Sequence, residues 1–156
     1  MIGIDPGITG AICKICPDGY ATVHDIPTIE KKGKAKIKRM IDAKALSSLI
    51  DDLLMNTDDR IIIEQVSAMP GQGVSSMFSL GDTFGCLRGV CESLGGKVEF
   101  VRPQDWKKHY NLGAVKGEAI ERALLMFPEL DHRLSRKKDH NRAEAALIAQ
   151  YGVEKL

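Results

Sequence analysis

The chain has 156 residues, a length that fits one domain, and its 44% hydrophobic and 28% charged residues predict an ordinary soluble globular protein with its own core. These values exclude intrinsically disordered, collagen-like and disulfide-scaffold proteins. A formal net charge of +1 gives no indication of a polyanionic partner, so only the distribution of charge along the chain is informative.

We expect neither a membrane span nor an export signal in this protein. No stretch approaches the roughly 18 consecutive apolar residues of a membrane helix. The first residues, MIGIDPG, are typical of a strand, whereas an export signal has a charged segment followed by an apolar one. We therefore expect a cytoplasmic protein with reduced thiols at Cys13, Cys16, Cys86 and Cys91. A zinc site is disfavoured, because Cys13 and Cys16 would point to opposite faces of a strand and Cys91 belongs to the apolar face of a helix.

The first 54 residues predict strands and then a helix. Residues 2–26 read as a meander of three short strands, with a turn at Pro17 to Gly19. The segment from Glu30 to Arg39 holds six basic residues against one acid, and its lack of apolar periodicity predicts a solvated loop. Apolar residues at helical spacing up to Leu54 then predict a helix that Asp42 caps.

The rest of the chain alternates between strands and helices. RIIIEQV at 60–66 predicts a central strand, residues 75–94 a long helix, and KVEFV at 97–101 a fifth strand. Further helices are expected from Pro103, across 117–127 with a stop at Pro128, and from about Asn141 to the end. This order predicts an α/β fold in a single domain, 1–156, with a mixed five-stranded sheet flanked by helices.

Asp5 is an acid in an otherwise apolar first strand. Gly7 and Gly10 follow it closely, and glycines leave an open approach for a phosphate or a metal ion. The alternative is that Asp5 only caps the turn at Pro6 and Gly7.

Glu64 directly follows three isoleucines in the strand predicted to be central. A buried carboxylate is costly, so it must be paired, bound to a metal or placed at the open end of the strand. A plain salt bridge is the alternative. Two such acids, Asp5 and Glu64, in one small sheet favour a cation or a polar cleft.

A third group, Asp139, His140 and Glu144, opens the last helix. His140 and Glu144 are four residues apart and share a helix face, whereas Asp139 converges on Glu144 only if it sits at the N-cap and curls inward. The alternative is an ordinary ion pair with Arg142 or Lys138.

Taken together, the four acids Asp5, Glu64, Asp139 and Glu144 form an oxygen-ligand set suited to Mg²⁺, with Mn²⁺ as a substitute. Two such ions about 4 Å apart would activate water and stabilise the leaving oxygen in phosphodiester hydrolysis. The acids therefore predict a metal-dependent nuclease.

Three segments resemble motifs of the RuvC-like Holliday junction resolvases. IGIDPGITGA resembles their first-strand motif, IIIEQV with the serine and Leu-Gly-containing helix after it resembles the second, and DHNRAEAALIAQYG is similar to the closing motif. The resemblance extends from Ile2 to Gly152 and implies an RNase H-like fold. The compact form, with WKK and a closing RAEA helix, is similar to the phage branch of the family.

By this resemblance Asp5, Glu64 and Glu144 match catalytic carboxylates that bind metal, and Asp139 takes the fourth place. The bacterial pattern has an acid or histidine three residues before the last acid, where this chain has Asn141. His140 is therefore a rival for the fourth place.

Basic residues outside the acids fit a DNA partner. They can neutralise phosphates, and a lysine near the scissile bond can stabilise developing charge. The alternative places Trp106 in the core and the lysines on a solvated helix face. The predicted DNA-contacting residues are Lys34, Lys36, Lys38, Arg102, Lys107, Lys108 and Lys116.

Aromatic contacts to DNA are less evident. Ser67 stands where the bacterial family places a base-stacking aromatic residue. Met69 and Phe78 could intrude at a branch point, although we expect Phe78 to lie in the core.

We expect a homodimeric, Mg²⁺-dependent endonuclease that resolves four-way and related branched DNA by paired nicks, in the host cytoplasm if phage-encoded. Two symmetric cuts require two active sites. Gly81, Gly85 and Gly89 recur every four residues and would permit close helix approach, unless that stripe packs on its own sheet. The alternatives are an RNase H-like nuclease acting on RNA or an RNA:DNA hybrid, and a non-catalytic junction-binding protein.

Overall fold

The computed structural model describes residues 1–31, 38–55, 59–68, 70–113 and 115–156. Within these ranges the strands are β1 (Ile2–Asp5), β2 (Ala11–Ile15), β3 (Ala21–Asp25), β4 (Thr28–Lys31), β5 (Lys38–Ile41), β6 (Arg60–Glu64) and β7 (Lys97–Val101). The α-helices are α1 (Ala43–Leu53), α2 (Val74–Ser93), α3 (Pro103–His109), α4 (Lys116–Met126) and α5 (His140–Lys155). Two 3₁₀ segments, η1 (Pro128–Arg133) and η2 (Lys137–Asp139), connect α4 to α5.

The main sheet has five strands in the order β3-β2-β1-β6-β7. The first three strands form an antiparallel meander, whereas β6 and β7 run parallel to β1. This arrangement confirms the predicted mixed five-stranded sheet.

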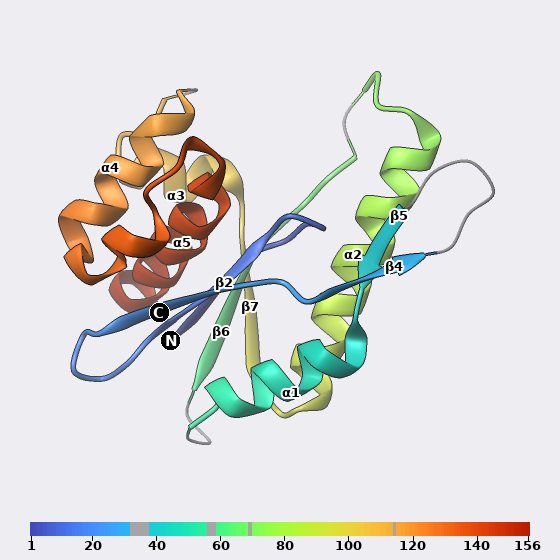
Figure 1. Ribbon diagram of the computed structural model, residues 1–156, viewed down its shortest axis with the longest axis horizontal. Coiled ribbons are helices and arrows are strands. Elements are labelled where there is room, and N and C mark those ends of the chain that lie inside the picture. The colour runs from blue at the N-terminus through green and yellow to red at the C-terminus, as the bar shows by residue number, and fades with distance from the viewer. Residues whose placement is uncertain (32–37, 56–58, 69, 114) are drawn as a thin grey trace.

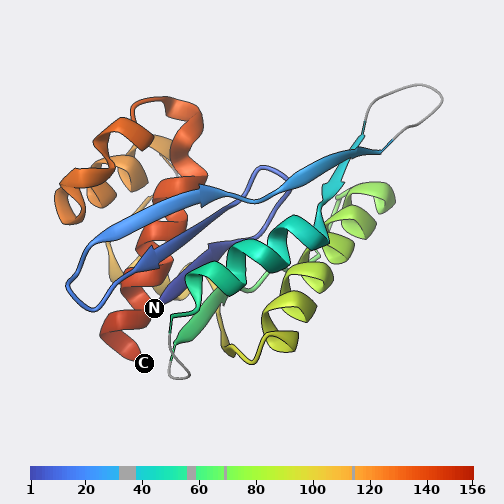
Figure 2. The ribbon, with the colours of Figure 1, turned by 60° about the horizontal axis from the view of Figure 1, so that its bottom comes forward.

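Helices cover both faces of the sheet. Figures 1 and 2 show α3, α4 and α5 on one face and α1 and α2 on the other. Alternation along the strands creates two cores: in β6, Ile62 packs towards α5, whereas Ile61 and Ile63 pack towards α1 and α2. None of the helices in the described ranges is long and apolar enough to cross a membrane.

The basic segment differs from the predicted solvated loop at its two ends. Residues of β4 and β5 pair as an antiparallel ribbon, with Glu30 opposite Arg39. Backbone pairing needs no apolar periodicity, so the sequence pattern did not reveal the ribbon. Residues 32–37, the remainder of the predicted loop, lie outside the described residues.

Helix α2 buries one face and leaves the opposite face open. Thr83, Leu87 and Cys91 are buried, and Leu87 and Cys91 belong to the core that the sheet shares with α1. On the other side, Cβ atoms built at Gly81, Gly85 and Gly89 would meet nothing within 4 Å, so the glycine stripe does not pack on its own sheet.

The same open face carries exposed apolar side chains. Val74 is 80% exposed and Phe78 is 78% exposed. The expectation that Phe78 lies in the core was therefore wrong, because the turn of the helix places it with the glycines.

Candidate active site

The parallel pairing of β1 and β6 brings Asp5 and Glu64 to one edge of the sheet. Each is the last residue of its strand, and the register pairs Ile4 with Ile63 immediately before them. The two acids lie on the α5 face, two residues beyond Gly3 and Ile62 respectively.

Gly3 allows α5 to lie directly on β1. A Cβ atom at Gly3 would stand 2.3 Å from the backbone N of Ala149 and 2.6 Å from the carbonyl O of Ala145, distances that no side chain permits. This close approach brings Glu144, the residue before Ala145, towards Asp5. The small side chains of Ala145, Ala146 and Ala149 also let α5 approach the sheet closely.

The Asp5 carboxyl is buried, with 8% of the residue exposed. Burial raises its pKa well above the ordinary value, the negative charges of Glu144 and Glu64 raise it further, and the charge of Lys107 opposes them. The three acids therefore share one electrostatic environment although they come from β1, β6 and α5.

Glu64 is held by α3. The indole Nε1 of Trp106, whose side chain is fully buried, donates a 2.7 Å hydrogen bond to Oε2 of Glu64. Burial raises the pKa of Glu64, and Glu144 adds to this, whereas the hydrogen bond from Trp106 and the charge of Lys107 act against it. The sequence offered Trp106 as a candidate core residue and gave no indication of this contact.

Lys107 supplies positive charge inside the acid cluster. Its Nζ lies 3.3 Å from Oε1 of Glu144 and 5.0 Å from the centre of the Trp106 ring. The three carboxylates offer the hard oxygen donors that Mg²⁺ prefers, and their mutual repulsion is what a bound cation would relieve. In the described part of the chain, however, no three His, Cys, Asp or Glu side chains are gathered closely enough to hold a metal ion as they stand.

Asp139 is bound by two arginines. Its carboxylate, on a residue that is 4% exposed, accepts hydrogen bonds of 2.9 Å from Nη2 of Arg136 and 3.3 Å from Nη1 of Arg142. The hydrogen bond from Arg136 is the main reason that the pKa of Asp139 is lowered. Arg142 also binds Asp25 at the end of β3. Asp139 as fourth ligand stays a prediction, and these contacts count against it.

The two residues after Asp139 have different surroundings. His140 lines a cavity of about 220 Å³ together with Lys107 and Glu144. Asn141 donates through Nδ2 to the carbonyl O of Thr9 at 2.6 Å and to its Oγ1 at 3.1 Å. This bridge ties α5 to the turn that follows Asp5, and nothing in the sequence pattern indicated it.

The predicted DNA-contacting residues are dispersed. Lys38 and Lys108 are exposed, while Arg102 is engaged by Asp105 through a 2.9 Å ion pair. Lys34 and Lys36 lie outside the described residues, and Lys116 begins α4. Only Lys107 of the set is placed in contact with the acid cluster among the described side chains.

The comparisons with known proteins bear on the fold. The structure of Thermus thermophilus RuvC in complex with a Holliday junction substrate matches with a TM-score of 0.52 and 16% identity, over 99% of this chain and 97% of that chain. A second structure of Thermus thermophilus RuvC matches with a TM-score of 0.49 and 16% identity, over 99% of this chain and 96% of that chain. No protein-family model and no curated protein sequence matches the chain. The likeness confirms the expected fold: the chain has the RNase H-like architecture of RuvC.

Proposed function

We propose that this chain is a metal-dependent, structure-selective endodeoxyribonuclease that resolves four-way DNA junctions by paired nicks. The observation that carries the proposal is the convergence of Asp5, Glu64 and Glu144 at one edge of a sheet with the fold of RuvC. The solved neighbour bound to a Holliday junction substrate supports branched DNA as the substrate class. Membership of the compact phage-type branch stays a prediction from the sequence.

The chemistry follows from the side chains. Asp5, Glu64 and Glu144 would hold Mg²⁺ or Mn²⁺, which would supply an activated water and stabilise the leaving oxygen in phosphodiester hydrolysis. Trp106 orients the Glu64 carboxylate, and Lys107 can neutralise a phosphate at the cluster once it is released from Glu144. For the fourth ligand, the cavity shared with Glu144 favours His140 over the arginine-bound Asp139.

Two further parts of the proposal concern assembly and DNA contacts. The open face of α2, with Gly81, Gly85 and Gly89 beside exposed Val74 and Phe78, supports a homodimer that supplies two active sites for two symmetric cuts.

Backbone phosphates of the DNA would be contacted by the predicted basic residues Lys34, Lys36, Lys38, Arg102, Lys108 and Lys116.

A cleavage assay tests the proposed function. A labelled four-way junction, a linear duplex and an RNA:DNA hybrid are each incubated with and without Mg²⁺. We expect paired nicks in the junction only when Mg²⁺ is present. Glu64→Gln should abolish cleavage, and the exposed Glu121→Gln is the matched control that should retain it.

Each other result assigns a different function. Preferred cleavage of the hybrid would make the chain a nuclease for RNA-containing substrates. Junction binding without cleavage at any Mg²⁺ or Mn²⁺ concentration would identify a non-catalytic junction-binding protein.

A further inference from the structure

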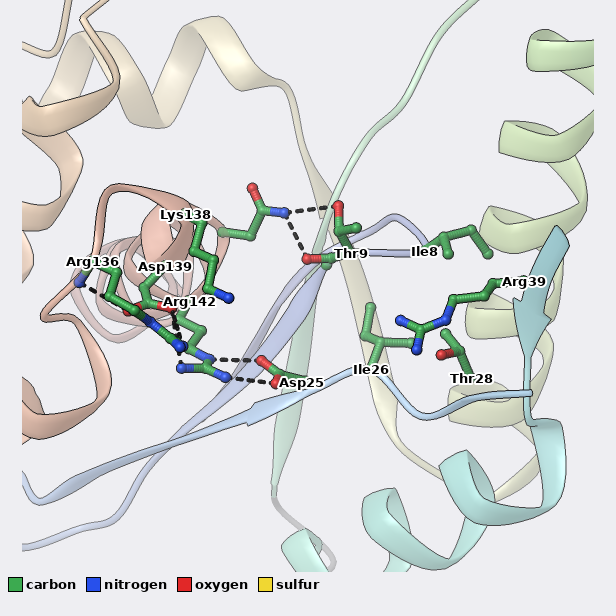
Figure 3. A pocket seen from close by; sticks show the side chains of 12 residues that line it. Ile8, Thr9, Asp25, Ile26, Thr28, Arg39, Arg136, Lys138, Asp139 and Arg142 are labelled. Carbon is green, nitrogen blue, oxygen red and sulfur yellow. Dashed lines mark hydrogen bonds and ion pairs between the residues drawn. The ribbon is translucent and has the colours of Figure 1, made fainter. Parts of the chain in front are cut away.

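A second polar cleft adjoins the turn that follows Asp5. It has a volume of about 500 Å³ and is formed by this turn, the end of β3 with the residues after it, β5, and the segment where η2 meets α5 (Figure 3). Asn141 lines this cleft while its Nδ2 is bonded to Thr9. The cleft is therefore next to the three-acid site but contains none of those three acids.

Positive charge dominates the cleft. Its lining includes four cationic side chains and two acidic ones, Asp25 and Asp139. Both acids are already bound by arginines: the guanidinium of Arg142 makes two 2.6 Å hydrogen bonds to Asp25, and Arg136 donates to Asp139 at 2.9 Å. Figure 3 shows these pairs on one side of the cleft. The acids hold Arg136 and Arg142 in fixed positions, which lowers the entropy cost of binding an anion.

Arg39 and Lys138 are the uncommitted cations. Both side chains are exposed, and neither makes a hydrogen bond or ion pair to any residue in the described ranges. Arg39 lies on β5 and Lys138 on η2, so the two approach the cleft from segments far apart in the chain. An oxyanion in the cleft would give both of them a partner.

We propose that this cleft binds the phosphodiester backbone of a nucleic-acid strand as it passes between the three-acid site and the β4-β5 ribbon, with Arg39 and Lys138 as the contacting groups. The proposal deepens the proposed function and rests on it for the identity of the strand. The described lining includes no aromatic side chain on which the base of a free nucleotide could stack, whereas a backbone needs only cations along its path.

Salt-dependent binding tests the proposal. The double variant Arg39→Ala with Lys138→Ala is compared with the wild-type chain and with a control that removes two exposed lysines elsewhere, Lys44→Ala with Lys155→Ala. Binding of a labelled four-way junction is measured in EDTA across a range of NaCl concentrations. Each phosphate contact contributes about 0.9 to the slope of log affinity against log salt, so we expect the cleft variant to lose about 1.8 and the control much less.

A second measurement locates the contact. Single phosphates along the strand flanking the cut are replaced in turn by neutral methylphosphonates. The wild-type chain and the control should lose affinity at one or two neighbouring positions, on the order of several-fold each. The cleft variant should be insensitive at those same positions, because the cations that contact them are already gone.

The outcomes separate this proposal from the proposed function. If the protein fails to cut any substrate but the cleft variant still lowers the salt slope, the function is wrong and the cleft assignment stands. An unchanged slope in the cleft variant overturns the cleft assignment, whether or not the junction is cut, and so does a protein that binds no nucleic acid. Displacement of the junction by inorganic phosphate beyond the effect of equal ionic strength of chloride would assign the cleft to a free anion instead.

Discussion

The indole Nε1 of Trp106 donates a 2.7 Å hydrogen bond to Oε2 of Glu64, so that a residue of α3 sets the position of a carboxylate on β6. The ring of Trp106 is fully buried, which anchors its N–H in one orientation. Trp106 is thus a positioning residue of the acid cluster, and it acts through Glu64.

Replacing Trp106 by Phe should keep most of the core but remove the hydrogen bond. That bond opposes the rise in the pKa of Glu64, so the pKa should rise further in Trp106→Phe. Because the ionised carboxylate is needed to hold a cation, we expect the acid limb of the pH-rate profile to move to higher pH. Cleavage at neutral pH should fall by about tenfold, as for a lost hydrogen bond to a charged group.

The pH dependence distinguishes positioning from mere packing. If Trp106→Phe lowers the rate equally at all pH values, the indole acts only by filling space in the core. A matched core substitution, Leu134→Ala, should lower stability without moving the pH profile.

Asp5→Asn should abolish cleavage and stabilise the metal-free protein. The pKa of Asp5 is raised above its ordinary value of 3.8, so its favourable contribution is present at acid pH and is lost as pH rises through the raised pKa. At pH 8 the raised pKa therefore favours the unfolded chain, in which the Asp5 carboxyl ionises freely, and an amide, which does not titrate, removes this cost. We expect a higher Tm for Asp5→Asn than for wild type in EDTA at pH 8, by a few degrees, roughly what 1 kcal/mol produces.

In the presence of Mg²⁺ the wild type should have a higher Tm than Asp5→Asn. The cation should raise the Tm of the wild type but not that of Asp5→Asn, because the amide is a poor ligand for a hard cation. Asp51→Asn, at an exposed position on α1, is the control and should behave as wild type. Equal Mg²⁺ stabilisation of Asp5→Asn would remove Asp5 from the metal site.

Asp139→Asn and His140→Ala should differ in what they lose. The lowered pKa of Asp139 means that its contribution to stability is present at neutral pH and is lost as pH falls through the lowered value. Asp139→Asn should therefore lower the Tm at pH 7 by roughly 5 °C. The difference in Tm between the wild type and this variant should become smaller at acid pH. It should keep measurable cleavage at temperatures where it is folded, whereas His140→Ala should lose more cleavage with little change in Tm.

The opposite order of cleavage activity in these two variants would contradict the choice of His140. A folded Asp139→Asn that is as inactive as Asp5→Asn, beside an active His140→Ala, would place Asp139 in the metal site. The arginine contacts described above would then have to rearrange when metal binds.

Gly85→Arg should convert a dimer to a monomer without unfolding the chain. Gly85 is exposed, and a Cβ atom built there meets nothing within 4 Å in the monomer. Sedimentation or light scattering gives the mass, and circular dichroism checks the fold. Ser79→Arg is the control, since it adds the same side chain at an exposed position about 120° around α2. A wild-type protein that is monomeric at all concentrations, or a Gly85→Arg that remains dimeric, contradicts the interface.

Local patterns in the sequence were sufficient to predict the elements of the sheet and the three converging acids. Asp5 and Glu64 each break an apolar run, and an acid among buried residues is unusual enough to be recognised without a structure. The cap at Asp42 was equally local, and its side chain accepts from the backbone N of Ala45. Such signals depend on neighbours within a few residues, which the sequence states directly.

The partners of those acids were decided only by the tertiary structure. The bond from Trp106 to Glu64 spans 42 positions, and that from Asn141 to Thr9 spans 132. The sequence grouped Asp139 with Glu144 as candidate ligands at the start of the last helix, but the fold places different cations beside them: Arg136 and Arg142 beside Asp139, and Lys107 beside Glu144. Residue spacing limits which groups can meet, whereas packing between distant segments determines which of them do.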